Sequence, residues 1–458
     1  MSTRAERDNR IPGDAEESAL SRAPISDAQR VRARRMHLFW RYYKGFHRPA
    51  LKVAPNQAND NVILNYSRRI VDKGMAFLFG GGVTFEIDSD VSERTPDEQY
   101  IDEVWGTPEQ KQRGLIDLAL NGAVSGTGCV RLYAPVTAGG VPRIVVLDSS
   151  MVDVVTNEDD IDDVRAYVIT WRAGDTWKRH RIDQQENGMW VVTEEFLSKG
   201  NVWQLVQETP WPWQFPPVFM CQNLPDPNSI WGMSDLEEAD INDAINFTAS
   251  NINRILRFHS HPKTIGTGFN ASKLQSTSID QFWSIDEANA KVYNLEMQSD
   301  LASAYQYLQT LKETYAKTSG VPNLDPEKLS VGQLSGFAMR ILYSDLLDKT
   351  DVKRITYGAL LADVNAALLE MAGRASGIKV KNVWVDPLPT NVLEEANVLD
   401  IDRRNGLSEQ TYLERRRYDA IREMKRNQEE QEAQQTIGER MLRQFELGDA
   451  TGKASVVS

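Results

Sequence analysis

Cysteine is scarce in this 458-residue sequence, with only Cys129 and Cys221, which lie far apart along the chain. Two distant thiols make no disulfide framework, so we expect a reducing cytoplasm as the setting. No stretch approaches the roughly 18 consecutive apolar residues of a membrane-spanning helix. Residues 1–23 are polar and charged, which argues against a secretory signal peptide. These absences predict a soluble protein, made inside a cell, that does not enter a membrane.

Positive charge is also in deficit. The chain carries 52 Lys and Arg against 65 Asp and Glu, a formal net charge of −13. A protein that wraps nucleic acid or reads its sequence is usually basic, because it must displace the counterions of the phosphates. The acidic balance therefore argues against tight wrapping of DNA, while DNA passing close by remains compatible with it.

The motifs of familiar enzymes are missing. No G-x-x-x-x-G-K-[ST], G-x-S-x-G, H-E-x-x-H or C-x-x-C occurs. His259-Ser260-His261 offers two imidazoles without a third ligand, and the acidic run 158–163 is typical of a solvated turn between strands. Gly80-Gly81-Gly82 lacks the Lys-Ser/Thr of a phosphate loop and is expected to end a helix. We predict no catalytic residue, no metal and no cofactor.

Two long amphipathic helices around a conspicuous loop dominate what is present. Both have apolar residues at i, i+3, i+4 and i+7. The first stripe holds Leu301, Ala304, Tyr305, Leu308, Leu311 and Tyr315; the second holds Tyr357, Leu360, Leu361, Val364, Leu368 and Met371. Pro322 and Pro326 lie between the two helices, with glycines on either side. These prolines and glycines cannot continue a helix. A loop of about fifteen residues is long for a compact domain unless it has a function.

The rest of the chain predicts an α+β protein, and its length predicts two to four domains. Helices are expected over 26–45 and 61–78, and two N-cap patterns, Thr95-Pro96 and Thr107-Pro108, start two more. Alternating β-branched and aromatic runs then predict a β-meander of six or seven strands. These runs are 128–133, 143–147, 151–156, 164–171, 189–196 and 202–206. Trp171, Trp177, Trp190 and Trp203 are expected to fill its core.

Further along, Ser234 to Glu237 reads as a capping box that starts a helix ending near Arg257. Residues 259–299 mix short apolar pieces with Gly, Asn and Ser, which predicts a small α/β insertion. A strand is expected over 378–385. Helices are expected over 391–404 and 408–443, the latter highly charged and solvated.

The order of these parts resembles the portal proteins of tailed, long-tailed bacteriophages, the rings through which DNA enters and leaves the head. Four stretches, spread over about residues 40–420, carry the likeness. They are Arg41-Tyr42-Tyr43-Lys44-Gly45 with 65–83; Pro217-Val218-Phe219 to Asn223 with Gly232 and Ser234-Asp235-Leu236; Ser319-Gly320-Val321-Pro322 to Ser335-Gly336-Phe337-Ala338-Met339; and Gly406-Leu407-Ser408 with Thr411.

The resemblance implies a portal fold: a wing of helices and strands, a two-helix stem, a small clip, a long kinked helix and a helical crown. The bounds follow in chain order. They are an N-terminal arm (1–29), the first wing part (30–233), stem helix 1 (234–257), the clip (258–298), stem helix 2 (299–318), the tunnel loop (319–336), the second wing part (337–405) and the crown (406–458).

The resemblance also implies sites and partners. The tunnel loop would face double-stranded DNA without sequence specificity, and the clip would meet the terminase large subunit and a head–tail adaptor. The loop residues are Asn323, Asp325, Glu327, Lys328 and Gln333, and the clip residues are Lys263, Lys273, Gln281, Trp283 and Lys291. The other implied partners are further copies in a ring of twelve, the major capsid protein and the scaffold protein. The implied location is a capsid vertex of the virion, after assembly in the host cytoplasm.

Two other functions stay open from the residues alone. A metal-assisted nuclease or hydrolase would need carboxylates brought together from different elements, and a metal-dependent activity assay would detect it. A helical adaptor that forms no ring would use the charged C-terminal helix to bind partners or scaffold, and its sedimentation would reveal a monomer.

Overall fold

The computed structural model describes residues 22–47, 50–53, 59–87, 94–135, 137, 139–260, 263–267, 289, 291–295, 301–322 and 336–388, with seven positions between 401 and 411. The chain divides into two compact units, Met1–Leu388 and Pro389–Ser458. The elements below belong to the first unit. Most of the expected helices 391–404 and 408–443 lies outside the described residues.

Four helices open the described chain: α3 (Asp27–Lys44), α4 (Tyr66–Phe79), α5 (Pro96–Trp105) and α6 (Pro108–Ser125). Both predicted capping boxes are confirmed, since Thr95 and Thr107 accept from the third backbone N–H while Glu98 and Gln110 reach back. Helix α4 ends as predicted at the glycines, where the Gly80 N–H donates to the Ala76 carbonyl. Local cap chemistry therefore fixes these helix ends.

The strands form separate sheets instead of one meander of six or seven. Strand β2 (Thr127–Tyr133) lies between β3 (Arg143–Leu147) and β9 (Val218–Gln222). A short 3₁₀ helix, Ser149–Met151, precedes an antiparallel five-stranded meander. Its strands are β4 (Val152–Thr156), β5 (Val164–Ala173), β6 (Thr176–Gln184), β7 (Trp190–Leu197) and β8 (Trp203–Trp211). Strands β6 and β9 were not predicted.

A further sheet joins distant parts of the sequence. Strand β1 (Val83–Ile87) pairs antiparallel with β12 (Val380–Trp384), with Val83 opposite Trp384. Strand β12 was predicted but β1 was not, because its five residues follow the glycines directly and pair only with a strand about 300 residues away. Its Phe85 is buried in the largest core cluster with Trp105, Tyr357 and Leu361. This cluster joins α4, α5 and α6 to residues 357–369 of the long helix described below.

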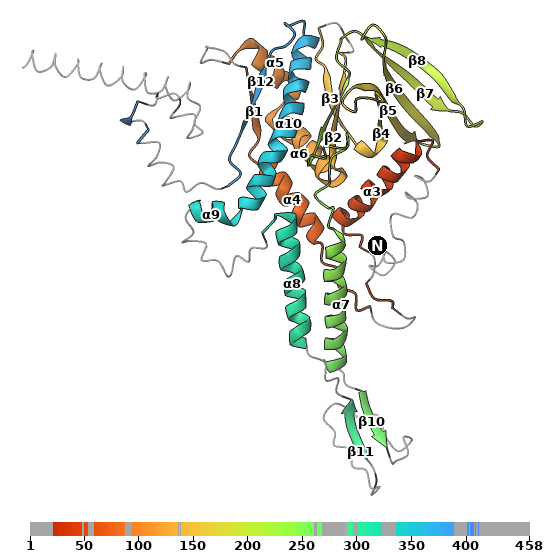
Figure 1. Ribbon diagram of the computed structural model, residues 1–458, viewed down its shortest axis with the longest axis vertical. Coiled ribbons are helices and arrows are strands. Elements are labelled where there is room, and N and C mark those ends of the chain that lie inside the picture. Colours follow the sequence, from red (N-terminus) through yellow and green to blue (C-terminus); the bar gives the residue numbers. More distant parts are fainter. Residues whose placement is uncertain are drawn as a thin grey trace, which may run out of the picture. The chain divides into compact units, whose positions relative to one another are not determined.

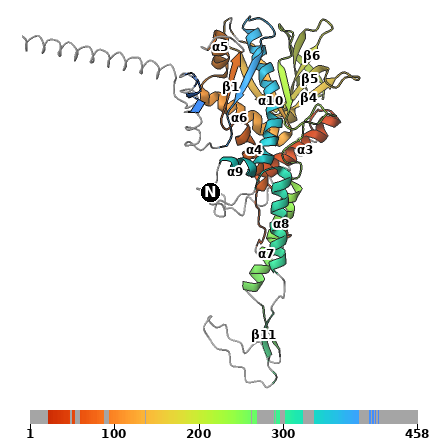
Figure 2. The same cartoon turned by 60° about the vertical axis from the view of Figure 1, so that its left-hand side comes forward.

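The region expected to form the stem and the clip contains α7 (Asp240–Ser260), the hairpin strands β10 (Lys263–Thr267) and β11 (Lys291–Leu295), and α8 (Leu301–Ser319). Helices α7 and α8 run side by side in Figures 1 and 2. The expected insertion thus contains two antiparallel strands. Residues 323–335 lie outside the described part. The long helix follows as α9 (Gly336–Leu342) and α10 (Ser344–Met371), and its interruption at Tyr343 agrees with the expected kinked helix.

Helix α7 begins six residues later than predicted. The Ser234 N–H does donate to Glu237, but its hydroxyl accepts from the Leu236 N–H and donates to the Val124 carbonyl at the end of α6. Residues 235–239 therefore form turns, and the regular helix starts at Asp240. A contact with another helix has replaced half of the local capping box.

Two side-chain predictions also need correction. Tyr305 was placed on the apolar stripe of the first long helix, yet its side chain is exposed on α8. Among the four tryptophans, only Trp190 is fully buried. Trp203 is half-buried and lies 4.2 Å from the guanidinium of Arg179, because an edge strand offers one covered face.

Candidate functional site

The site lies where α7 and α8, the two expected stem helices, meet the base of the long helix. Ile245 of α7 and Leu308 and Tyr315 of α8 share one buried cluster with Ile70 of α4 and Leu346 of α10. Four helices distant in sequence are thus packed together at the two ends of the expected tunnel loop. The position of that loop's flanks depends on this junction.

A polar ladder on α7, formed by Asn242, Asn246 and Ser250, binds an extended segment of the chain. These residues recur every four positions and share one helix face. Their side-chain oxygens accept from the backbone N–H groups of Tyr66, Leu64 and Val62, each at 2.9 Å. The Asn242 amide also donates to the Leu64 carbonyl at 2.8 Å. Helix α7 therefore supplies the backbone partners that residues 62–66 would otherwise find in a sheet.

Asp60, which precedes the extended segment, is bound to α7 by ion pairs. Its side chain is 5% exposed and lies 2.7 Å from Arg257 Nη1 and 3.4 Å from Arg254 Nε. The Asp60 carbonyl accepts from the Asn253 amide at 3.0 Å. The segment that leads into α4 is thereby fastened along most of the length of α7.

A carboxylate between two lysines forms the centre of the site. Asp235 is 1% exposed, and its Oδ2 lies 2.6 Å from Lys353 Nζ on α10, which is itself 3% exposed. The other oxygen, Oδ1, lies 3.1 Å from Lys349 Nζ one turn earlier. Burying charges is costly unless they are paired, and here each carboxylate oxygen has its own ammonium partner.

The geometry accounts for the pKa values at this centre. Burial alone would raise the pKa of Asp235, but attraction to Lys353 and Lys349 outweighs it and holds that pKa below the ordinary value. Burial lowers the pKa of Lys353, and repulsion from Lys349 adds to this, while Asp235 offsets part of it. One carboxylate receives two attractions, whereas each lysine receives one. Asp235 is therefore ionised at neutral pH.

Lys349 extends the centre to the end of α8. Its ammonium donates to the carbonyl of Ser319, the last residue of α8, at 3.2 Å. A cation is favourable there because the carbonyls at the C-terminus of a helix have no intrahelical partner. Lys349 thus links Asp235, α10 and the residue from which the chain enters the expected tunnel loop.

A second branch ties the centre to β9. The Asn223 amide donates to Asp235 Oδ1 at 3.4 Å, and Tyr357 Oη donates to Asn223 Oδ1 at 3.1 Å. All three side chains are buried. A Cβ added to Gly122 of α6 would lie 1.8 Å from Tyr357 Oη, so only glycine leaves room for this hydroxyl. The network thereby fixes the long helix against both a sheet and a helix.

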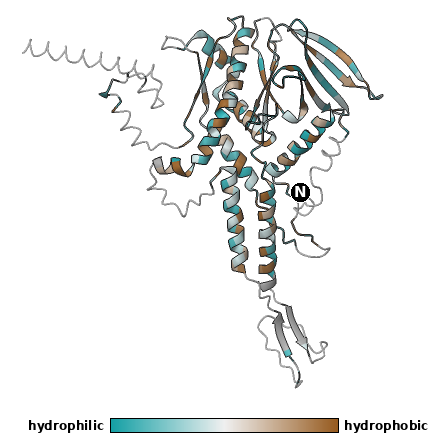
Figure 3. Ribbon diagram, in the orientation of Figure 1, coloured by the Kyte–Doolittle hydropathy of each residue, from teal (hydrophilic) through white to brown (hydrophobic). Residues whose placement is uncertain are grey.

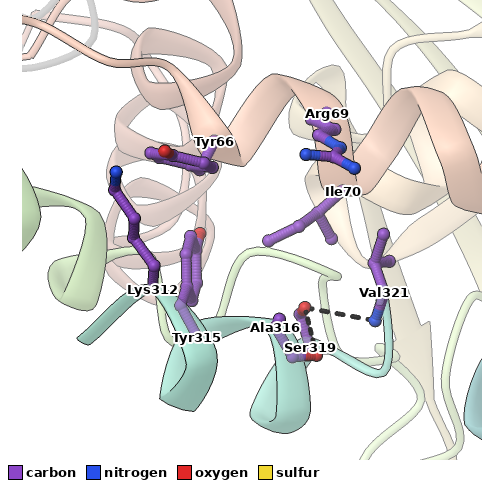
Figure 4. A pocket seen from close by; sticks show the side chains of 8 residues that line it. All are labelled: Tyr66, Arg69, Ile70, Lys312, Tyr315, Ala316, Ser319 and Val321. Atoms are coloured by element: carbon purple, nitrogen blue, oxygen red, sulfur yellow. Dashed lines mark hydrogen bonds between the residues drawn. The ribbon is translucent and has the colours of Figure 1, made fainter. Parts of the chain in front are cut away.

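A pocket lies beside the same junction, between α4 and α8 (Figure 4). Ile70, Ala316 and Val321 give it apolar walls, and Tyr315 stands beside them. Arg69 and Lys312 supply cationic groups at its edge. The Val321 N–H donates to Ser319 Oγ at 3.3 Å, which holds the wall formed by Val321 in place.

Most of the predicted site residues lie outside the described part of the chain. These are Asn323, Asp325, Glu327, Lys328 and Gln333 of the tunnel loop, and Lys273, Gln281 and Trp283 of the clip. The other two clip residues lie on the hairpin. Lys263 of β10 pairs with Leu295 of β11, and Lys291 of β11 pairs with Thr267 of β10. The two lysines therefore lie at opposite ends of the hairpin, and Lys291 is exposed.

The prediction from sequence overlooked the buried centre. Asp235 was noted only within an expected capping box and a family motif, and Lys349 and Lys353 were not considered. A signal was present: Lys353 falls on the same helix face as Leu346, Tyr357 and Leu360, where an apolar residue is expected. A lysine on an apolar face indicates a buried anion, although the sequence does not say which one.

Comparison with known proteins gives the family. The model of the family described as "Phage portal protein, SPP1 Gp6-like" matches residues 22–436. The chain belongs to the phage portal protein family. No curated protein matches the sequence. Portal proteins are structural components of virions, and the predicted family resemblance is confirmed.

Solved structures of gene transfer agent (GTA) particles are similar to this chain. One is described as the neck of a native particle computed with C12 symmetry, at 14% identity and a TM-score of 0.48, covering 88% of this chain and 98% of that one. Another is the virion of a native particle, at 15% identity and a TM-score of 0.43, with the same coverage of 88% and 98%. A third, the neck of an empty particle computed with C6 symmetry, has 15% identity and a TM-score of 0.44, covering 76% and 88%.

The described residues contain no group of three or more His, Cys, Asp or Glu side chains arranged to hold a metal ion. The acidic run 158–163 forms turns, with the Asp163 N–H donating to the Asp160 carbonyl. No helix within the described ranges is long and apolar enough to cross a membrane. Cys129 and Cys221 are buried free thiols, and burial raises the pKa of Cys221 to about 12.

Proposed function

We propose that the chain assembles into a ring, expected to have twelve copies, at one vertex of a capsid. Double-stranded DNA passes through this ring when a terminase packages the genome and again when it is ejected. The observation that carries the proposal is the portal family match over residues 22–436, which contains both stem helices and the whole long helix. The expected role is structural, without catalysis or cofactor.

In this proposal, the loop between α8 and α9 is the part that faces DNA, through Asn323, Asp325, Glu327, Lys328 and Gln333. Support comes from the flanks of the loop. The end of α8 is held by Lys349, and the base of α10, just beyond α9, is held by the buried Asp235, so the chain is held on both sides of the loop. Such an arrangement suits a constriction that adjusts to DNA.

The net negative charge of the chain favours DNA that moves through the ring over DNA that is bound tightly by it. Twelve copies at −13 carry about −156 before counterions bind, so the field of the ring opposes tight phosphate binding. Contact with DNA would be weak, independent of sequence and spread over many subunits. A channel with such contacts lets the duplex move without pausing at one register.

The other partners are assigned by region. The clip, with Lys263, Lys273, Gln281, Trp283 and Lys291, would contact the terminase large subunit during packaging and a head–tail adaptor afterwards. Residues 406–458 would form the crown inside the head, and the wing would meet the major capsid protein and scaffold. Assembly would take place in the host cytoplasm and end in the virion.

A null allele of the gene in the genome that carries it tests this function. We expect heads without DNase-resistant DNA, and recovery of packaging when the wild-type chain is supplied in trans. A chain in which glycine and serine replace residues 323–335 should form rings but alter packaging or DNA retention. Normal amounts of packaged DNA in the null strain would contradict the proposal.

A further inference from the structure

The outward side of the long helix carries one stripe of acidic and apolar side chains, which we call the acidic face. It consists of Asp345, Asp348, Val352 and Ile355 of α10, at successive spacings of three, four and three residues. All four are exposed, with Val352 at 39% and Ile355 at 73%. Figure 3 shows hydrophobic and hydrophilic residues together along α10.

The apolar members of this face are out of place on a free surface. Single exposed apolar residues are ordinary, but Val352 and Ile355 lie side by side on one helix face, as on a surface that another molecule covers. Within the described ranges, no cation lies at ion-pair distance from Asp345 or Asp348. The acidic face therefore has both apolar area and unpaired negative charge to offer a partner.

A surface of opposite charge lies on α4 and α8, which we call the basic face. Arg69, Lys73 and Ala76 follow one another at spacings of four and three residues on α4, and Lys312 joins them from α8. Lys73 is exposed, and no described acidic group pairs with Lys73 or Lys312. The pocket with apolar walls lies between Arg69 and Lys312 (Figure 4).

The two faces are separate patches of one chain. Helices α4 and α10 pack through Ile70, Phe77 and Leu346, and Gly74 lies against the Asp235–Lys353 pair. Residues 69, 73 and 76 of α4 lie outside the side formed by Ile70, Gly74 and Phe77. The acidic stripe likewise lies opposite the buried residues of α10.

The faces also lie at the same level along the molecule. Val321 lines the pocket of the basic face, and a Cβ on the preceding residue, Gly320, would be 3.6 Å from the Asp345 carbonyl. Rotation about a ring axis keeps the level of each residue along that axis. A head-to-tail ring needs two different, complementary patches on each subunit.

We propose that the acidic face of one copy docks on the basic face of the next copy in the ring. This rests on the proposed ring, and it names the surfaces that hold the ring together. Asp345 and Asp348 approach Arg69, Lys73 and Lys312 of the neighbouring copy, while the apolar residues of the stripe cover the apolar walls of the pocket. The contact joins the base of each long helix to the stem of its neighbour.

Two charge-reversed variants test the contact. We expect Asp345→Lys/Asp348→Lys and Arg69→Glu/Lys73→Glu each to lose the ring, so that light scattering gives the 51.8 kDa monomer while circular dichroism retains the wild-type fold. The matched control, Glu158→Lys/Glu186→Lys, reverses two exposed acids on turns of the five-stranded sheet and should keep the ring.

Mixing the two variants gives the sharpest outcome. The reversed acidic face of one variant matches the reversed basic face of the other, and the two unchanged faces also match. An equimolar mixture should therefore form rings of alternating copies, although neither variant does so alone. Raising the salt from 0.1 M to 1 M should weaken this rescue, because ions screen exposed charges.

The outcomes separate this inference from the proposed function. If the wild-type chain forms rings and both variants keep them, the contact proposed here is wrong while the portal function stands. The contact is equally wrong if the basic-face variant loses only its binding to duplex DNA, or if mixing restores nothing. If the wild-type chain forms no ring even with capsid and scaffold proteins, the proposed function itself fails.

Discussion

Asp235 has two positive partners, and this imbalance decides how the residue responds to change. Its oxygens lie 2.6 Å and 3.1 Å from two ammonium groups on one helix. Loss of either lysine leaves one buried carboxylate oxygen without its ammonium partner, whereas loss of the carboxylate leaves two buried or half-buried cations facing one another. The network therefore holds α10 in one register against the turn that leads into α7.

Replacing Lys353 with methionine should destabilise the fold strongly. The change keeps the side-chain length and removes the partner at 2.6 Å, so Asp235 retains only Lys349. Breaking a buried ion pair from one side costs about 3–5 kcal/mol, and we expect a loss of that order in the free energy of unfolding by urea. The control Lys199→Met, on an exposed turn, should change it by less than about 0.5 kcal/mol.

The double variant Asp235→Asn/Lys353→Met tests whether loss of the ion pair causes the loss of stability. It removes the carboxylate together with its closest cation, so it should lose less stability than the sum of the two single variants. A double-mutant cycle gives this coupling directly. Additive losses would show that the pair contributes nothing beyond packing.

The lowered pKa of Asp235 predicts how stability depends on pH. Since the folded pKa lies below the value of about 3.9 for an unfolded Asp, the unfolded chain binds more protons between the two values. This contribution is fully present above pH 5 and is lost as pH falls through the folded pKa. The difference in unfolding free energy between wild type and Asp235→Asn should therefore shrink below about pH 4. A difference that stays constant from pH 7 to pH 3 would contradict the assignment.

Sequence reasoning found the neighbourhood of this centre but not its chemistry. The pairing of Asp235 with Lys349 and Lys353 joins residues more than 100 positions apart, and no spacing rule connects them. Lys353 was detectable as a charge on an apolar face. Its partner was not, because the three-dimensional packing of α10 against residues 234–239 selects it.

At the scale of elements, the ladder of α7 replaces a sheet partner for residues 62–66. Asn246→Ala should free the Leu64 N–H, which is bound at 2.9 Å and lies where water does not readily replace the lost partner. We expect a loss of about 1–3 kcal/mol, as for a buried donor left unpaired. Hydrogen exchange should show the Leu64 amide exchanging faster while amides of α6 stay protected.

The matched control for this change is Asn251→Ala on the same helix. Asn251 is half-buried and makes no hydrogen bond to residues 62–66. Its replacement should leave the Leu64 amide as slow as in wild type. Equal effects of the two substitutions would mean that general helix stability protects the segment and that the ladder does not.

The close approach of α6 and α10 makes a second prediction for elements. Gly122→Ala places a methyl group 1.8 Å from Tyr357 Oη, so the hydroxyl must leave Asn223. Overpacking of this kind costs about 1–3 kcal/mol in thermal or urea unfolding. Gly114→Ala on the same helix meets only Trp105 at 3.7 Å and should be neutral or stabilising. In a Tyr357→Phe background, the cost of Gly122→Ala should fall; an unchanged cost would contradict the steric explanation.

Elements defined by local chemistry were predictable, and those defined by distant pairing were not. The capping motifs at Thr95 and Thr107 predicted two helices, and the structure contains both. Strand β6 was missed because its charged residues, among them Lys178, Arg179 and Arg181, mask the alternation. The helix expected to start at Ser234 begins at Asp240 because an interhelical contact overrides the cap.

At the scale of the whole molecule, the family resemblance supplied the function and the physical chemistry supplied the constraints. Acidic charge and missing enzyme motifs excluded classes of protein, but neither names a portal. The order of four stretches did so, and the family match over residues 22–436 confirmed it. The expected tunnel loop and most clip residues depend on this family assignment, because residues 323–335 and 268–288 lie outside the described part.

The mass of the purified chain in solution tests the central claim most directly. Light scattering, with negative-stain images of the same sample, should give about 620 kDa for twelve chains of 51.8 kDa and rings with a central channel. A stable 51.8 kDa monomer across a range of salt concentrations, still unassembled when capsid and scaffold proteins are added, would contradict the account and favour a monomeric adaptor.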